Sequence, residues 1–397
     1  MSRVTPAGRR LSGFLLLVAL VVPGWWVPAV AAGSDADGVQ FQTPTAEGAL
    51  LSPVAYRVEL KSAAEPVRVE LLTHLPDDPV AYVRETGVTP LGADSYEARL
   101  TDTGHIPPNT TLRYAFRAVL PDGSVALSPE ATITIADERF DWRSISDGVV
   151  TLHWYEGDDA FAQRALGIGS SAIEKAATLL GVTDMPEVDF FVYADQNAFY
   201  DALGPGTREN VGGQANADIR TMFGLITPSE VSSDWVDTLV SHELTHLVFA
   251  QAVDNPYHLP PRWLNEGLAV HLSQGYDTSD QATVASAVNS SSIIPLEGLA
   301  GLFPTTRDRF SLAYAESASA IDFLITTYGE DRLVKLITSY AGGVTDDEAF
   351  QAALGMDMAA FDDAWMASVG ATRPAPFGPQ AAPAGPLPEG WSASPAP

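Results

Sequence analysis

Cysteine is absent from the 397 residues of this chain, and only seven histidines and 22 lysines and arginines occur beside 50 aspartates and glutamates. The lack of cysteine excludes disulfides, thiolate ligands and lipid-modified thiols, so any metal ligands must come from His, Asp and Glu. The shortage of bases leaves a formal net charge of −28. Nucleic acids and anionic membrane surfaces are bound through Lys/Arg patches, and we therefore expect neither as a partner.

The amino terminus carries three arginines, an apolar run over residues 11–22 and a small-residue sequence at 29–32. This order predicts a secretory signal peptide over residues 1–32, because the apolar run is too short to span a bilayer comfortably. We therefore expect a secreted or extracytoplasmic protein, at the cell surface if it is retained. The alternative is an uncleaved N-terminal anchor, which would be the only membrane contact that we expect.

The next two segments differ in pattern. Residues 33–53 are largely polar and rich in glycine and alanine, which predicts a linker. Residues 54–136 contain short runs of alternating apolar and polar residues, separated by turn signals such as that at 121–124. About seven such runs in this length predict an antiparallel β-sandwich of the immunoglobulin or fibronectin type III kind. The sandwich carries no residue pattern with evident chemistry.

Strand and helix patterns alternate in the following segment, and helical patterns dominate after it. The expected strands are 149–155, 188–193, 211–217 and 221–226, with helices at 159–180 and 197–203 between them. We therefore predict a second domain over residues 138–370, with an α+β fold and a helical C-terminal part. Residues 371–397 contain eight prolines and no apolar period. This composition predicts a disordered or polyproline II tail.

An H-E-x-x-H motif begins at His242, inside an apolar-periodic segment that predicts a helix with Asp234 as its N-cap. On an α-helix, residues i and i+4 lie one turn apart on the same face. His242 and His246 can therefore offer imidazole nitrogens to a single Zn²⁺, and Glu243 can reach a water bound to that metal. The alternative is a structural helix with two solvated or core histidines.

A catalytic zinc usually has three protein ligands and one position open for water. The candidates for a third ligand after the motif are His258, Glu266, His271 and Asp277. A histidine six residues beyond His246 is excluded, because Ala252 stands there. Glu266 and His271 lie on one predicted helix at an angle of about 140°, so both cannot face the metal well. A carboxylate at Glu266 would also neutralise part of the zinc charge.

The sequence H-E-L-T-H, followed after 19 residues by Glu266 within R-W-L-N-E-G-L-A, resembles the gluzincin peptidases. This group includes thermolysin-like enzymes, aminopeptidase N-like enzymes and the bacterial peptidase MA-like domains, and the last of these matches best. The resemblance is specific at residues 242–246 and 262–269. It implies a zincin catalytic domain, with His242, His246 and Glu266 as ligands of one catalytic Zn²⁺ and Glu243 as the general base.

Two weaker resemblances concern the substrate. The segment at Tyr314 is similar to a tyrosine-containing segment of aminopeptidase N-like enzymes, which implies that Tyr314 donates to the oxyanion. A buried core tyrosine is the alternative. Residues 213–216 lie where those enzymes carry a glycine-rich strand with an amine-binding glutamate, and this chain has no acid there. The glycines predict a sheet edge to which a peptide could add, with a plain hairpin as the alternative.

The expected function is therefore that of a secreted or cell-surface zinc metallopeptidase acting on peptide or protein substrates, through a zinc-activated water and the base Glu243. The missing acid favours cleavage within chains over trimming of amino termini. Two alternatives stay open: a secreted binding protein with a vestigial or structural zinc site, and a zinc hydrolase of non-peptide substrates. The sequence indicates no oligomeric state.

Overall fold

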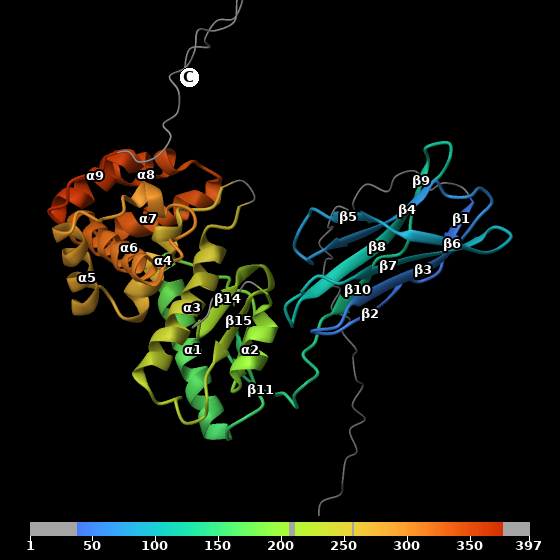
Figure 1. The fold of residues 1–397 in the computed structure, drawn as a ribbon, viewed down its shortest axis with the longest axis horizontal. Helices are drawn as coiled ribbons and strands as arrows, with labels where there is room; N and C mark the ends of the chain where they lie inside the picture. The colour runs from blue at the N-terminus through green and yellow to red at the C-terminus, as the bar shows by residue number, and fades with distance from the viewer. Residues whose placement is uncertain (1–37, 206–210, 256–257, 376–397) are drawn as a thin grey trace, which may run out of the picture.

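The structure is a computed structural model that describes residues 38–205, 211–255 and 258–375 (Figure 1). Two units lie side by side: an all-β unit that ends at about residue 135 and a unit of strands and helices that begins at about residue 143. The predicted signal peptide and most of the proline-rich tail lie outside the described residues. Within the described ranges, no helix combines the length and the apolar composition needed to cross a membrane.

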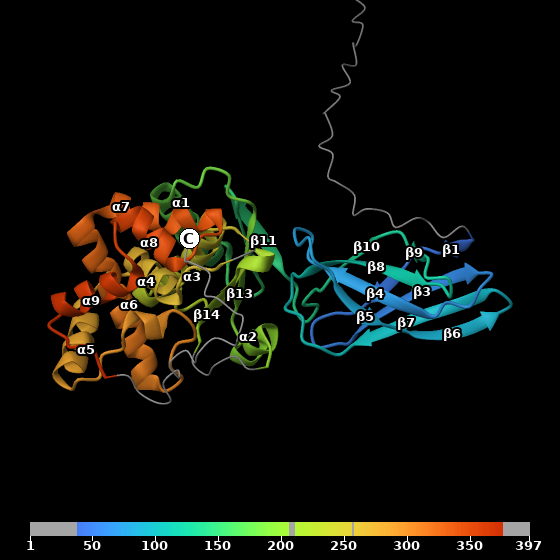
Figure 2. The ribbon, with the colours of Figure 1, turned by 90° about the horizontal axis from the view of Figure 1, so that it is seen from above.

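The all-β unit consists of two antiparallel sheets around one core (Figures 1 and 2). The first sheet has the order β1 (Val39–Phe41), β3 (Val54–Ser62), β7 (Ser95–Asp102) and β6 (Gly87–Gly92), with β2 (Thr45–Glu47) also on β3. The second has the order β10 (Ala131–Thr134), β8 (Thr111–Val119), β4 (Arg68–His74) and β5 (Tyr82–Glu85), with β9 (Val125–Leu127) on β8. Alternate residues of β3 and β8 point into the core, as the period of two predicts. The assignment to the immunoglobulin or fibronectin type III kind stays a prediction.

The segment that was expected to be a linker carries two of these strands. β1 and β2 both pair with β3, with Phe41 opposite Leu60 and Ala46 opposite Tyr56. Phe41 and Ala46 also pack against the core of the sandwich. The linker prediction is therefore wrong for these residues. Strands of three residues are too short to show an alternating pattern, and they form here because β3 offers unpaired backbone groups on its edge.

The second unit is built on a five-stranded sheet, in the order β11 (Arg143–Asp147), β12 (Val150–Trp154), β13 (Val188–Tyr193), β15 (Thr221–Leu225) and β14 (Gly213–Asn216). The three central strands are parallel and the two outer strands are antiparallel to them. Helices α1 (Asp159–Leu180) and α3 (Asp234–Ala252) share the larger core with one face of the sheet. Helix α2 (Gln196–Leu203) covers the other face. The sheet thus supports the motif helix α3 on one side.

Helices make up most of the chain beyond α3, as predicted. They are α4 (Arg262–Ser273), α5 (Thr278–Asn289), α6 (Arg307–Tyr328), α7 (Glu330–Ser339), α8 (Asp346–Leu354) and α9 (Met358–Ser368), with short 3-10 helices η1 (Ala217–Ile219), η2 (Leu296–Leu299) and η3 (Tyr340–Gly342). Helix α4 lies between α3 and α6 (Figure 1). The N-cap of α3 is Ser233, so the prediction of Asp234 as N-cap is wrong by one residue. Asp234 and Asp237 still place negative charge in the first turn, where the helix dipole favours it.

Polar contacts join the two units directly. The side-chain amide of Asn109 donates to Asp189 Oδ2 of β13 at 2.8 Å and to Thr221 Oγ1 of β15 at 3.0 Å. Arg220 forms an ion pair of 2.7 Å with Asp77 of the sandwich. These contacts hold the sandwich against one end of the sheet.

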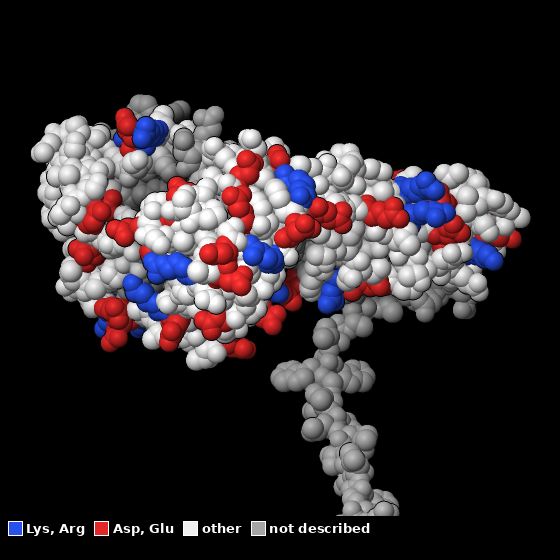
Figure 3. Space-filling view, turned by 90° about the horizontal axis from the view of Figure 1, so that it is seen from below, with Lys and Arg blue, Asp and Glu red and all other residues white. Residues whose placement is uncertain are grey.

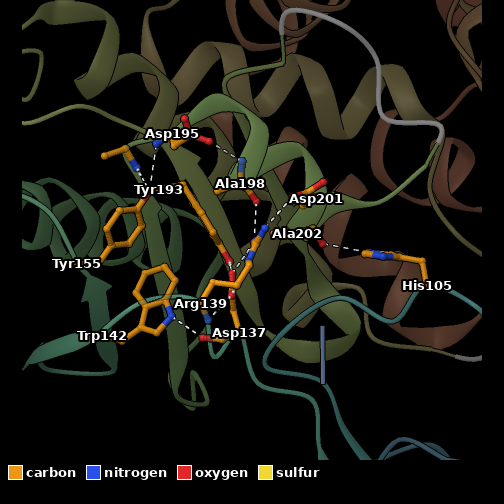
Figure 4. Close-up of polar contacts among 11 residues, drawn as sticks. His105, Asp137, Arg139, Trp142, Tyr155, Tyr193, Asp195, Ala198, Asp201 and Ala202 are labelled. Atoms are coloured by element: carbon orange, nitrogen blue, oxygen red, sulfur yellow. Dashed lines mark hydrogen bonds and ion pairs between the residues drawn. The ribbon is translucent and has the colours of Figure 1, made fainter. Parts of the chain in front are cut away.

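The connector between the units, residues 136–142, is also anchored (Figure 4). Tyr193 of β13 donates its hydroxyl hydrogen to Asp137 Oδ2 at 2.9 Å, and Arg139 forms an ion pair of 2.7 Å with the same carboxylate. Nearby, His105 Nε2 lies 3.1 Å from the carbonyl oxygen of Ala202 in α2. The connector therefore packs on the second unit and fixes the C-terminal end of the sandwich to it.

Candidate metal centre

Three side chains from α3 and α4 meet at one point. His242 Nε2 and His246 Nε2 are 3.2 Å apart, and Glu266 Oε2 lies 3.4 and 3.5 Å from them. Three ligands of a tetrahedral zinc with bonds of about 2.0–2.2 Å lie about 3.3–3.5 Å apart, so this triangle fits one such ion. Across the described ranges, these are the His and acidic side chains that group closely enough to hold a metal.

The carboxylate of Glu266 has one oxygen that is bound and one that is not. Oε1 accepts hydrogen bonds from Arg262 Nε at 3.0 Å and Nη2 at 2.9 Å. Oε2 is buried and has no hydrogen-bond partner, although it faces both histidines. Burial opposes ionisation, but the attraction of His242 and His246 outweighs it and lowers the pKa of Glu266 well below its ordinary value. A buried, ionised oxygen that accepts no hydrogen bond is costly, and a cation at this point would remove that cost.

Asn265 orients one of the histidines. His246 Nδ1 donates to Asn265 Oδ1 at 2.8 Å, so its Nε2 is the nitrogen that faces Glu266. Burial lowers the pKa of His246, but the attraction of the nearby Glu266 carboxylate outweighs burial and raises this pKa to about 9. A metal ion would therefore displace a proton from the cluster, as is general for histidine ligands.

Glu243 follows His242 in α3 and lies beside the three candidate ligand side chains. Its Oε2 accepts a hydrogen bond of 2.9 Å from the backbone N–H of Ala215 in β14. A Cβ atom on Gly213 of the same strand would lie 3.0 Å from Glu243 Cγ and from Leu239 Cδ1. The glycine thus lets β14 approach α3 closely enough to hold the glutamate by its backbone.

β14 is an edge strand of the sheet, in agreement with the prediction. It pairs with β15, to which η1 connects it, and no described strand lies on its other side. Gly213 of this strand lies closest to side chains of α3. Gln214, within the segment 213–216 that lacks the amine-binding acid, has an exposed side chain.

Tyr314 of α6 comes to the same place from a distant part of the sequence. Its ring centroid is 6.0 Å from that of His242, and it packs against Phe303 at 5.4 Å and Phe310 at 4.9 Å. Burial and the charge of Glu266 raise the pKa of the Tyr314 hydroxyl above its ordinary value. The hydroxyl therefore stays protonated and can donate a hydrogen bond at any pH near neutrality.

The other three candidates for a third ligand lie elsewhere. His258 Nε2 is 2.9 Å from Asp346 Oδ1 of α8. Asp277 caps α5 by accepting two backbone hydrogen bonds. His271 is near the end of α4, where burial and the charge of Lys175 lower its pKa. Of the four candidates, the structure brings Glu266 to the two motif histidines.

Three neighbours of Glu266 were given no role from the sequence: Arg262, Asn265 and Gly267. Arg262 is four residues before Glu266, and this spacing on a helix is a signal that could have identified their ion pair. A Cβ atom on Gly267 would lie 2.5 Å from the carbonyl oxygen of Ser317. Only glycine therefore permits the close packing of α4 on α6 that brings Tyr314 to the site, and nothing in the sequence shows which helix it meets.

Glu316, two residues after Tyr314, is a buried carboxyl outside the metal centre. Its side chain is 0% exposed, and Oε1 accepts the backbone N–H of Ile294 at 2.9 Å. Oε2 has no hydrogen-bond partner. Burial raises the pKa of Glu316 to about 8, so the group is largely uncharged at neutral pH. It fixes the segment before η2 against α6.

The variant Glu316→Gln is expected to weaken the pH dependence of stability between about pH 5 and 8. The folded pKa of about 8 lies above the ordinary value of 4.5. The folded protein therefore retains a proton that the unfolded chain has lost, and the wild type loses stability as pH rises through this window, by up to about 5 kcal/mol. Glutamine is neutral throughout and keeps the acceptor for Ile294. Urea unfolding at pH 5, 7 and 9 measures this, and equal pH dependence of both proteins would contradict it.

Comparison with known proteins gives one family match. The Peptidase MA superfamily matches residues 168–371, just over half of the chain and including both metal-site helices. No match occurs among curated proteins. The fold search finds a two-domain M1 zinc metallopeptidase at 13% identity and TM-score 0.40, covering 86% of this chain and 96% of that one. It also finds an aminopeptidase N family protein from Idiomarina loihiensis at 10% identity and TM-score 0.42, covering 81% and 75%. The family match confirms the resemblance seen in the motifs, and the chain belongs to the Peptidase MA superfamily.

Proposed function

We propose that the protein hydrolyses peptide bonds with one zinc ion held by His242, His246 and Glu266. The observation that carries this proposal is the buried, unpartnered Oε2 of Glu266, which lies 3.4 and 3.5 Å from the two histidine nitrogens. Membership of a peptidase superfamily supports it. When bound, zinc supplies a Lewis acid that polarises a carbonyl group and lowers the pKa of a water molecule.

In this proposal Glu243 is the general base. It takes a proton from the attacking water and delivers it to the leaving amine, a role that needs a carboxylate close to the ligands but not itself bound to the metal. Glu243 meets this requirement because it follows His242 on the helix while its Oε2 is held by the Ala215 N–H at 2.9 Å. The backbone hydrogen bond fixes the direction of the carboxylate before substrate binds.

Tyr314 is proposed to stabilise the negative charge that develops on the substrate carbonyl oxygen. Support comes from the position of its ring beside His242 and from a hydroxyl that burial keeps protonated. A donor of this kind contributes most in the transition state, when the carbonyl oxygen carries its greatest charge. Phe303 and Phe310 hold the ring in place.

The substrate is proposed to lie along β14 and to be cut within its chain. The free edge of β14 offers backbone groups to an extended peptide, which is a common mode of peptide binding. The strand itself, Gly213–Asn216, carries no acid that would bind a free amino terminus. An endopeptidase activity follows more readily from these features than an aminopeptidase activity.

We further propose that the protein acts outside the cytoplasm, with an immunoglobulin- or fibronectin-like sandwich that extends from β1 to about residue 136 and a peptidase domain at 138–370. The N-terminal sequence that motivates this location lies outside the described residues. Mass spectrometry of the mature amino terminus from culture medium tests it. A secreted product that still begins at Met1 would contradict cleavage.

The experiment that tests the function is digestion of a peptide library by the zinc-loaded protein, with and without a chelator. We expect cleavage inside the peptides, its loss when zinc is removed, and its return when zinc is added back. Mass spectrometry of the products separates internal cleavage from amino-terminal trimming. Bound zinc with no cleavage of any peptide would contradict the proposal and favour a binding protein with a structural zinc site.

A further inference from the structure

The proposed catalytic centre opens into a cleft between the two units. The cleft has a volume of about 1100 Å³ and is lined by His246 and Glu266 on one side. The sandwich lines the opposite side with the end of β4, the loop at 75–78 and Tyr82 of β5. Sites for drug-sized molecules measure about 300–1000 Å³. This cleft therefore has room for a peptide segment of several residues, and the sandwich forms one of its walls.

Each wall carries a large exposed apolar side chain. Tyr82 of the sandwich is 74% exposed, and Leu259, in the loop before α4, is 76% exposed. Both line the cleft. Covering such exposed apolar side chains with a ligand removes apolar surface from water, which favours binding. The two side chains can therefore bind a peptide from opposite sides.

The two arginines of the cleft are already paired with acids. Arg220 forms an ion pair of 2.7 Å with Asp77, and Arg262 forms one of 2.9 Å with Glu266. Each pair is neutral overall. Neither arginine is therefore available to attract an acidic substrate.

Four carboxylates of the cleft wall have no such partner. They come from both units and are Asp78, Asp184, Asp218 and Asp254. In the described ranges, no Lys, Arg or His forms an ion pair with any of them. Figure 3 shows acidic side chains spread over both units on the face that it presents, and the formal net charge of −28 adds to the local field. The same cleft contains the proposed metal site, where Oε2 of Glu266 is buried without a hydrogen-bond partner. The cleft is thus negatively charged and favours cationic ligands.

We propose that the sandwich is a substrate-recognition wall of the active-site cleft, and that the cleft selects polypeptide segments carrying lysine or arginine away from the scissile bond. This inference rests on the function proposed above and names its substrate class. Tyr82 and Leu259 contact apolar side chains of the segment, and the four free aspartates attract its basic side chains. The loop at 75–78 places Asp78 on the sandwich side, so recognition requires both units.

The test uses the full chain and three fluorogenic peptides with the same residues around the cleaved bond. One carries two distal lysines, one carries two glutamines at those positions, and the third carries two glutamates. We expect kcat/KM to fall in the order lysine, glutamine, glutamate, mainly through KM. The difference between the peptides should shrink as salt is raised from about 0.05 to 0.5 M, because salt screens exposed charges.

Asp78→Asn and Asp218→Asn test the two walls separately. Each is expected to lower the ratio of kcat/KM for the lysine peptide to that for the glutamine peptide by about two- to fivefold, the range for exposed ion pairs. Glu65→Gln is the matched control, since Glu65 is exposed on the sandwich and does not line the cleft. It should retain the wild-type ratio. A lysine-to-glutamine ratio near one in the wild type, or one that Asp78→Asn leaves unchanged, would overturn the inference.

A binding measurement separates this inference from the proposed function. Fluorescence anisotropy measures the binding of labelled lysine and glutamine peptides to Glu243→Gln protein. This variant is used because binding can then be measured without hydrolysis of the peptide. Tighter binding of the lysine peptide without hydrolysis by the wild type would support a basic-peptide site and contradict the peptidase. Hydrolysis with equal binding of both peptides would support the peptidase and contradict this inference.

Discussion

Glu243→Gln protein is expected to bind zinc like the wild type and to hydrolyse peptides about 10²–10⁴ times more slowly. The reason is that Glu243 is not one of the three side chains that form the metal-sized triangle, so zinc binding does not need its charge. A glutamine has nearly the same size and can still accept the Ala215 N–H, but it cannot take a proton from water. The loss should appear in kcat, with the zinc content unchanged.

Two measurements decide this prediction: single-peptide kinetics and the zinc-to-protein ratio of the same preparation. Glu174→Gln serves as a matched control, because Glu174 is an exposed glutamate of α1 that has no part in the proposed site. The control should keep full activity. A Glu243→Gln protein with wild-type kcat would rule out Glu243 as the base, and one that lost its zinc would show that Glu243 also supports the metal.

Tyr314→Phe is expected to lower kcat by about 10²–10³-fold while changing KM little. This is the effect of removing one donor that stabilises a developing oxyanion. Phenylalanine keeps the ring and its contacts with Phe303 and Phe310, so the change removes the hydroxyl and little else. The competing interpretation, that Tyr314 is a core residue, predicts a modest change in stability and no change in kcat.

Tyr328→Phe on the same helix provides the comparison. The hydroxyl of Tyr328 approaches Met356 Sδ at 3.9 Å, on the side of α6 that faces α8 and α9 and not the metal centre. Its removal should leave kcat unchanged. If both variants show the same kcat as the wild type, Tyr314 has no role in the reaction. Thermal unfolding of both variants then shows whether either hydroxyl matters to the fold.

Much of the site could be predicted because its motif residues are spaced by one turn of an α-helix. His242 and His246 are one turn apart, and that distance in sequence translates directly into a distance in space. The strand and helix patterns of the second unit also appear close to where they were expected, since alternation and helical periodicity depend on local burial. The short strands β1 and β2 were missed because three residues carry no period, and their formation depends on β3.

The sequence left several candidates for the third metal ligand, and only the fold distinguishes them. His258, His271 and Asp277 had the right chemistry, but His258 contacts Asp346, Asp277 caps α5, and His271 lies near the end of α4 close to the charge of Lys175. Glu266 reaches the histidines because α4 packs between α3 and α6. Gly267 permits that packing, and Arg262 holds the other carboxylate oxygen. Such contacts join residues far apart in the sequence, and no local pattern specifies them.

Three properties can be read from the residues in order: two histidines and a glutamate share one turn of a helix, no cysteine is available as a metal ligand, and the chain is strongly acidic. Those properties follow from residue type and helical geometry alone. The tertiary structure decided that Tyr314 stands beside His242 and that Asp78 of the sandwich faces the same cleft as Glu266. These placements depend on how separate elements pack. The hydrophobic effect is non-directional, so it does not specify which faces meet, and only close packing in the complete fold does.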